Sequence, residues 1–270
     1  MTRLFRSRVA VAPCCLALAL ASTGCDVNLG NGDFSLGLVS GQSTDTWTRS
    51  YTVRPGGRFE IVNVNGLVQV EPGAGEAIEI HAERRAKAST DEAAKDLLGR
   101  VEMREDVKPE AVRLEAKPPK TFRGGVDIKF FVKVPAGLNV IARTVNGGIK
   151  LINVPNDIEA STTNGGVEAE QVSGTLRVST TNGGVRLALS GLGKGGLRAE
   201  TVNGGVNLEM PRDAKANISA HVVNGGLGVD NLQLETIGEQ TRRRVEGKLN
   251  GGGPPIELGT TNGGIHLTGK

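Results

Sequence analysis

The sequence predicts an all-β fold: a single-chain β-solenoid of the parallel β-helix type, with coils of 18–21 residues and one short helix near residues 90–102. Two observations predict it. Asn-Gly-Gly recurs at regular intervals in the second half, and the short segments between these motifs alternate apolar and polar residues. The composition agrees, because 39 of 270 residues are glycine, about twice the usual share, and only 3% are aromatic.

Residues 1–24 have the pattern of a signal peptide, with three arginines ahead of an apolar stretch from Val9 to Ala21. That stretch is too short to be a stable membrane span. Because residues 1–24 contain no acidic residue, the remaining chain carries 32 − 3 = 29 basic and 29 acidic groups. A neutral body with few aromatic residues argues against nucleic acid as a partner.

Gly24-Cys25, preceded by small residues, resembles a bacterial lipobox, in which the cysteine is lipidated and becomes the mature N-terminus. We therefore expect an exported protein that is anchored to a membrane of the cell envelope by a lipid on Cys25. Ser22 departs from the lipobox pattern, so ordinary cleavage that leaves a free thiol at Cys25 is the alternative. Residues 25–46, which are rich in small polar residues, are expected to form a flexible tether.

A folded domain is expected over residues 47–270. In its first half, Ser89-Thr90-Asp91-Glu92 has the pattern of a capping box and predicts the start of the helix. Around it, tight-turn signals separate segments of alternating hydrophobicity that predict strands. These segments are residues 59–64, 67–70, 78–80, 112–114 and 126–134.

The second half contains an internal repeat that is clearest over residues 140–270. Asn-Gly-Gly begins at seven positions there, and the first four intervals between them are 18, 18, 21 and 21 residues. Each unit holds two short strands that cannot bury their apolar face alone, so consecutive units are expected to stack. The predicted corners, apart from the motif at Asn250, are Asn146, Gly147, Gly148, Asn164, Gly165, Gly166, Asn182, Gly183, Gly184, Asn203, Gly204, Gly205, Asn224, Gly225, Gly226, Asn262, Gly263 and Gly264.

Stacking gives the corner residues a physical role. Glycine would allow a positive φ and a close approach between coils, and asparagine tolerates the left-handed region. Stacked asparagine side chains could also form an amide ladder. The alternative is a set of unrelated hairpin turns, since Asn-Gly is also a strong hairpin signal. A register check favours stacking, because Lys150, Glu168 and Arg186 would be neighbours of alternating charge.

Three local motifs are expected to be structural rather than chemical. Gly191–Gly196 matches a dinucleotide-binding pattern, but a strand pattern follows it where a helix N-terminus is required. Gly225–Asp230 matches one calcium-binding nonapeptide, which needs consecutive copies. Arg242–Arg244 is expected to be a solvated loop, with contact to an anionic polymer as the alternative.

No catalytic, cofactor-binding or metal-binding residue is predicted. The mature part has three histidines, His81, His221 and His266, and no cluster of the three or four convergent ligands that zinc needs; the last two histidines are expected on outward strand positions. Glu168 and Glu170 share one strand face and could mimic a hydrolase pair, although neighbouring exposed glutamates are common.

The segment from Val134 to Val140, followed by residues 143–149 and the later Asn-Gly-Gly units, resembles a bacterial adhesin-like domain family of unknown function. The resemblance covers residues 48–270 and is weaker before residue 125. It implies a β-solenoid in an envelope protein, and the family has no established catalytic residues to transfer.

The sequence therefore predicts a non-enzymatic envelope lipoprotein that binds or scaffolds an envelope protein or polysaccharide. One alternative is a carbohydrate-active β-helix enzyme, which would need a groove with acidic groups and aromatic platforms. Another is an envelope sensor or regulatory protein that docks on a membrane partner. The ligand, the oligomeric state and the membrane that holds the anchor are left open.

Overall fold

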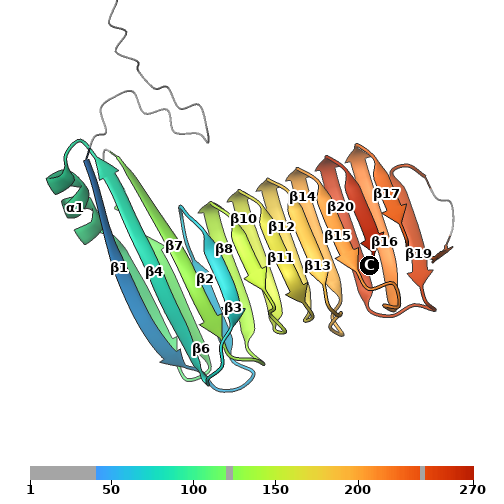
Figure 1. Ribbon diagram of the computed structural model, residues 1–270, viewed down its shortest axis with the longest axis horizontal. Helices are drawn as coiled ribbons and strands as arrows, with labels where there is room; N and C mark the ends of the chain where they lie inside the picture. Colours follow the sequence, from blue (N-terminus) through green and yellow to red (C-terminus); the bar gives the residue numbers. More distant parts are fainter. Residues whose placement is uncertain (1–40, 120–123, 238–240) are drawn as a thin grey trace, which may run out of the picture. The chain divides into compact units, whose positions relative to one another are not determined.

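The computed structural model describes residues 41–119, 124–237 and 241–270. Within these residues the strands form two sheets, of ten and eleven strands, which we call sheet I and sheet II. Figure 1 shows their strands following one another from β1 to β19. A single short helix, α1 (Asp91–Gly99), accompanies the strands in the described residues. The all-β prediction is confirmed.

Each sheet is a row of paired strands that runs from one edge to the other. In this spatial order, sheet I consists of β1 (Gly41–Thr52), β4 (Ala77–Ala88), β7 (Gly125–Val134), β3 (Val68–Pro72), β9 (Ile149–Ile152), β11 (Val167–Val172), β13 (Val185–Leu189), β15 (Val206–Met210), β21 (Ile265–Gly269) and β17 (Leu227–Asp230). Sheet II consists of β18 (Leu234–Thr236), β19 (Arg244–Leu249), β16 (Ala216–Asn224), β20 (Pro255–Asn262), β14 (Leu197–Asn203), β12 (Leu176–Asn182), β10 (Asp157–Asn164), β8 (Asn139–Asn146), β2 (Arg58–Val62), β6 (Ala111–Lys117) and β5 (Glu102–Lys108).

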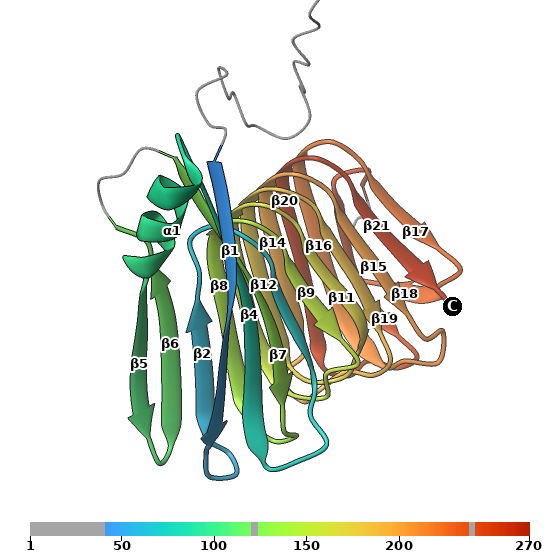
Figure 2. The ribbon, with the colours of Figure 1, turned by 60° about the vertical axis from the view of Figure 1, so that its left-hand side comes forward.

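Each repeat unit forms one coil: a strand of sheet II, a corner, and then a strand of sheet I. Neighbouring coils pair in parallel and in register, so that Asn146, Asn164 and Asn182 are direct partners. Figure 2 shows these strands side by side through the stack. The predicted solenoid is confirmed over the hairpin alternative, because a hairpin meander would pair its strands antiparallel.

The order of the coils in space differs from their order in the chain. The coil β20–β21 lies between β14–β15 and β16–β17, although it follows both in sequence. A similar displacement occurs near the other end, where β2–β3 lies between β6–β7 and β8–β9. The corners have nearly the same local sequence. The corner motif by itself therefore does not determine which coils become neighbours.

The first strands close one end of the stack with antiparallel pairing. β1 pairs with β4, and β4 pairs with β7. β1 begins at Gly41, so this strand includes part of the segment expected to be a tether. Helix α1 packs on β1 and β4. Its N-cap is Thr90, whose hydroxyl accepts a hydrogen bond from the backbone N–H of Ala93. The predicted capping box would have placed the N-cap one residue earlier, at Ser89.

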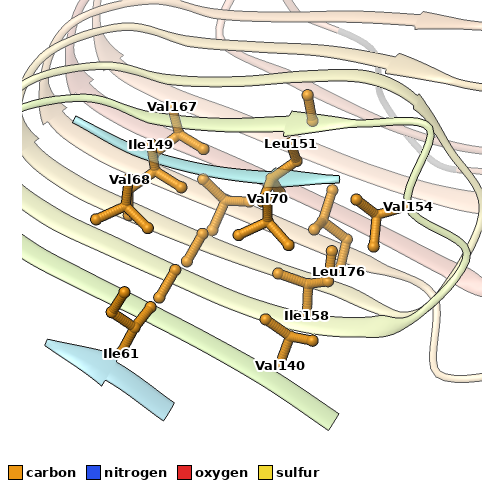
Figure 3. Close-up of a cluster of buried hydrophobic side chains, with 14 of the residues drawn as sticks. Ile61, Val68, Val70, Val140, Ile149, Leu151, Val154, Ile158, Val167 and Leu176 are labelled. Carbon is orange, nitrogen blue, oxygen red and sulfur yellow. The ribbon is translucent and has the colours of Figure 1, made fainter. Parts of the chain in front are cut away.

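The core lies between the two sheets and follows the two-residue period of the strands. In β12, Leu176 and Val178 point inward while Arg177 is exposed. In Figure 3, Val70 of sheet I lies beside Ile158 and Leu176 of sheet II. This apolar interior fixes the register, because a shift by one residue would expose it.

The predicted signal peptide, Cys25 and the tether up to residue 40 lie outside the described residues. No helix within the described ranges is long and apolar enough to cross a membrane.

Candidate functional site

The predicted corners form a continuous column of asparagine side chains. In each pair of neighbouring coils, the side-chain Nδ2 of one asparagine donates to the Oδ1 of the next, at 2.8–2.9 Å. At one end, Asn65 Nδ2 donates to the carbonyl of Val126 at 3.1 Å. The expected amide ladder is therefore present, and it runs through Asn65, Asn146, Asn164, Asn182, Asn203, Asn262 and Asn224.

Asn65 was not among the predicted corners, and Asn250 has a different role. Asn65 is followed by only one glycine, so it does not match the Asn-Gly-Gly motif. Asn250 does have the full motif, but its Nδ2 donates to the carbonyls of Arg212 and Ala214, both at 2.8 Å. It has a φ of 50° in the turn between β19 and β20, and therefore belongs to a local turn.

The first glycine of each corner is needed because the coils approach closely. A Cβ on Gly183 would overlap the carbonyl oxygen of Gly165 in the neighbouring coil. The same overlap recurs at Gly147, Gly165, Gly204, Gly225 and Gly263. The expected positive φ is not the general reason, because Gly147 and Gly183 have none, and the corner asparagines do not occupy the left-handed region. Close packing between coils is the reason shared by all corners.

A second column, of buried threonines, lies just before the asparagines. The hydroxyl of Thr162 donates to the carbonyl of Gly147 at 2.9 Å, and that of Thr180 to the carbonyl of Gly165 at 2.8 Å. Thr144, Thr201 and Thr260 make the equivalent bond. These bonds satisfy carbonyl groups at the corners, where the strand ladders are interrupted. The corner residues thus form a structural spine.

The outer face of sheet I carries the predicted row of alternating charge. Lys150, Glu168 and Arg186 are direct partners in register, which confirms the register check. The ammonium of Lys150 lies 3.0 Å from Glu170 and 3.9 Å from Glu168. Its hydrogen bond to Glu170, together with the charges of the surrounding glutamates, raises the pKa of Lys150. Glu168 and Glu170 are therefore both paired with one lysine.

A network of charges also lies on the outer face of sheet II. The buried carboxylate of Glu60 contacts Arg113 at 2.5 Å, Arg143 at 2.6 Å and Arg58 at 3.5 Å. The hydrogen bond from Arg113 to Glu60 raises the pKa of that guanidinium. Several cations thus share one carboxylate, and the network holds β6, β2 and β8 together on this face.

The outer face of sheet I also has a hollow of about 310 Å³ near β1, β4, β7 and β3. Phe131 lies in it, with the ring of His81 6.2 Å away, centroid to centroid. Gln69, Glu79 and Lys133 also line the hollow. Apart from Phe131, every aromatic side chain in the described part of the chain is buried or packed against the core: Trp47, Tyr51, Phe59 and Phe130. The hollow therefore combines an outward aromatic ring with charged and amide groups.

The remaining predicted motifs have structural surroundings. Gly191–Gly196 connects β13 to the strand β14, as expected. Asp230, at the end of the nonapeptide match, lies 2.9 Å from the Nε2 atom of His266. His221 and His266 are exposed, as predicted. Across the described ranges, no group of three or more histidine, cysteine, aspartate or glutamate residues is arranged to hold a metal ion.

The run of three arginines lies beside the last corner. The backbone carbonyl of Arg243 accepts from Val222, and that of Arg242 accepts from Leu227, both by N–H bonds of 2.8–3.0 Å. The side chains of Arg242 and Arg243 are exposed, whereas Arg244 pairs with Glu246 at 2.6 Å. The segment thus fastens the final coil through its backbone.

Comparison with known proteins agrees with the fold. Residues 155–268 match the family Toastrack DUF4097, which confirms the expected resemblance over this part of the chain. A solved structure from Clostridium sporogenes ATCC 15579, named a "putative cell adhesion protein", is 14% identical, with 84% of this chain and 100% of that one covered and a TM-score of 0.50. It shows the same fold.

A second solved structure, a "putative adhesin" from Bacteroides fragilis NCTC 9343, is also 14% identical. The match covers 83% of this chain and 97% of the Bacteroides fragilis chain, with a TM-score of 0.32, which is too low to support an argument. No curated protein matches the chain.

Proposed function

Starting from the match of residues 155–268 to Toastrack DUF4097, we propose that the chain is an adhesin-like, non-enzymatic binding module of the cell envelope. In this proposal a lipid on Cys25 anchors the exported protein to a membrane, and the segment before β1 tethers the stack to that anchor. The outer face of sheet I then binds an envelope polysaccharide. The hollow around Phe131 is the observation that carries the proposal.

The hollow suits a saccharide because of the groups that it combines. An aromatic ring that faces solvent can pack against the apolar face of a sugar ring. Glu79 can accept hydrogen bonds from sugar hydroxyls, while Gln69 and Lys133 can donate to them. Beyond the hollow, sheet I continues as a row of polar side chains from Lys150 to Asn207, along which an extended polymer could lie.

Catalysis receives less support from the same face. A glycoside hydrolase needs two carboxyl groups on either side of the bond that is cleaved, one of which must be protonated. Glu168 and Glu170 lie two residues apart on the same strand, β11, and both pair with the ammonium of Lys150, at 3.9 Å and 3.0 Å, so they share one cation instead of standing on either side of a bond. We therefore rank the carbohydrate-active enzyme below the binding module. Docking on a membrane protein remains the other candidate partner class, which co-purification distinguishes.

Phe131→Ala tests the binding proposal. Purified peptidoglycan sacculi and the exopolysaccharide of the producing organism serve as probes, with retention of the protein as the readout. Loss of the ring contact, if worth about 1.4 kcal/mol, lowers the affinity about tenfold. Asn207→Ala, on an exposed position of the same sheet, is the matched control and should bind normally. Equal binding by both variants, or no binding by the unaltered protein, would reject the proposal.

The anchor has a separate test. Mass spectrometry of the mature N-terminus should find a diacylglyceryl group on Cys25, and Cys25→Ala should release the protein from the membrane fraction. A mature chain with a free thiol at this position would contradict the lipid anchor but leave the binding test unaffected.

A further inference from the structure

Asn-Gly is the dipeptide most prone to spontaneous deamidation, and the described residues contain eight such steps. In this reaction the backbone nitrogen of the glycine attacks the side-chain carbonyl carbon of the asparagine. A carbon–nitrogen bond forms, the bond to the side-chain nitrogen breaks, and ammonia leaves. Water then opens the resulting succinimide to aspartate or isoaspartate. The eight asparagines are Asn65, Asn146, Asn164, Asn182, Asn203, Asn224, Asn250 and Asn262.

Six of these steps are locked by the stack of coils. In each, the glycine N–H donates to the backbone carbonyl of the asparagine in the next coil, at 2.8–3.0 Å. Cyclisation requires that this nitrogen lose its proton and that the backbone rotate toward the side chain. Both changes would break a hydrogen bond inside the stack. The locked glycines are Gly66, Gly147, Gly165, Gly183, Gly204 and Gly263.

Asn224 differs because it stands at the end of the column, where no further coil follows. Its backbone carbonyl accepts from Gly263, but the N–H of Gly225 has no acceptor within the described part of the chain. Gly225 is also exposed, whereas each of the six locked glycines is buried or half-buried. The side chain of Asn224 makes one hydrogen bond, from its Nδ2 to Asn262 Oδ1 at 2.9 Å.

Asn250 provides an internal comparison. The N–H of Gly251 also has no acceptor among the residues described. However, the Nδ2 of Asn250 donates to two backbone carbonyls, each at 2.8 Å, and these bonds hold the side chain in the turn. Asn250 must therefore break two hydrogen bonds to react, whereas Asn224 must break only one.

We propose that Asn224 is a spontaneous modification site of the folded protein, converted by water to aspartate and isoaspartate ahead of every other Asn-Gly step described. The product loses the Nδ2 donor, so that a carboxylate then faces Asn262 Oδ1 at the end of the amide column. Isoaspartate also adds a methylene group to the main chain at the last corner. The inference is independent of the saccharide proposal.

The test is prolonged incubation of the folded protein in mildly alkaline buffer, followed by peptide mapping and enzymatic detection of isoaspartate. Asn224 should convert at least about tenfold faster than the six locked sites, because those sites react only after local opening of the stack. In a parallel sample unfolded in urea, the rates of the Asn-Gly sites should converge. That convergence would show that the folded structure, rather than the neighbouring sequence, sets the order.

Asn224→Ala is the matched control variant. In the peptide map it should remove the isoaspartate signal of the peptide that contains residue 224, while the six locked sites keep their rates. The inference is overturned if any locked asparagine converts as fast as Asn224, or if Asn250 converts ahead of it. It is also overturned if the same order of rates persists in urea.

Discussion

Gly183 and Gly184 are adjacent residues at one corner, and the structure predicts opposite tolerance of a methyl group at the two positions. In Gly183→Ala, the new Cβ would overlap the carbonyl oxygen of Gly165, which belongs to the rigid backbone of the neighbouring coil. In Gly184→Ala, the nearest atom would be the carbonyl oxygen of Gly205 at 3.6 Å, an ordinary van der Waals separation. The pair therefore separates the steric demand of stacking from general glycine effects.

The expected magnitude follows from the contacts at this corner. Overpacking a rigid site costs about 1–3 kcal/mol. Moving these two coils apart would also weaken the backbone hydrogen bonds that join them, Gly165 N–H to Asn182 and Val167 N–H to Gly184, which contribute about 1 kcal/mol each. Gly183→Ala should therefore lose about 3–5 kcal/mol of unfolding free energy. Gly184→Ala should change it by less than about 1 kcal/mol, since alanine restricts the unfolded chain.

Thermal and urea unfolding, followed by circular dichroism, measure both variants. The melting temperature of Gly183→Ala should fall by about 6–20 °C, while that of Gly184→Ala should stay within a few degrees. If the two variants lose the same stability, or if Gly183→Ala unfolds like the unaltered protein, the close-approach explanation of the corner motif is wrong.

The remaining predictions concern one buried hydroxyl and one phenol. Thr180→Val should cost about 1 kcal/mol of unfolding free energy by urea titration, because it removes the 2.8 Å bond to Gly165, while Thr181→Val on the exposed face should be neutral. Burial, with the 2.5 Å hydrogen bond to Glu105, raises the pKa of Tyr51 above its ordinary value of 10.0. The neutral phenol thus stabilises the fold below that pH, and this contribution is lost as pH rises toward the folded pKa. Tyr51 is the sole tyrosine, so its ultraviolet absorbance reports the titration directly, and Tyr51→Phe should flatten the loss of stability above about pH 10. A normal titration curve would contradict the burial argument.

Much of the stack could be predicted because the interval between corner motifs can be read directly from the sequence. Intervals of 18 residues place Lys150 beside Glu168 once coils are assumed to pair in register, and the structure has this pairing. The outward position of Phe131 also follows from the two-residue period, since Phe130 and Val132 on either side are buried. The alternation places Phe131 outward but does not show which side chains of neighbouring strands surround it, so the hollow was not predicted.

The order of the coils could not be predicted in the same way. Asn203 presents the same hydrogen-bonding groups to Asn224 or to Asn262, so local sequence does not choose between these neighbours. The choice depends on long-range packing, including the antiparallel pairing of β19 with β16. Asn65 was missed for another reason: it makes the same ladder bond with only one glycine after it.

The insertion of β20–β21 between two earlier coils has a consequence for how the molecule is made. A solenoid whose coils follow the order of the chain can add one coil at a time to the end of the stack, because each new coil contacts only the coil before it. In this protein, residues 216–230 do not pair with residues 197–210. Both segments pair instead with residues 255–269, which lie between them and come later in the chain. Completion of the stack therefore depends on contacts between residues far apart in sequence, and direct pairing of β14–β15 with β16–β17 would leave β20–β21 without its place.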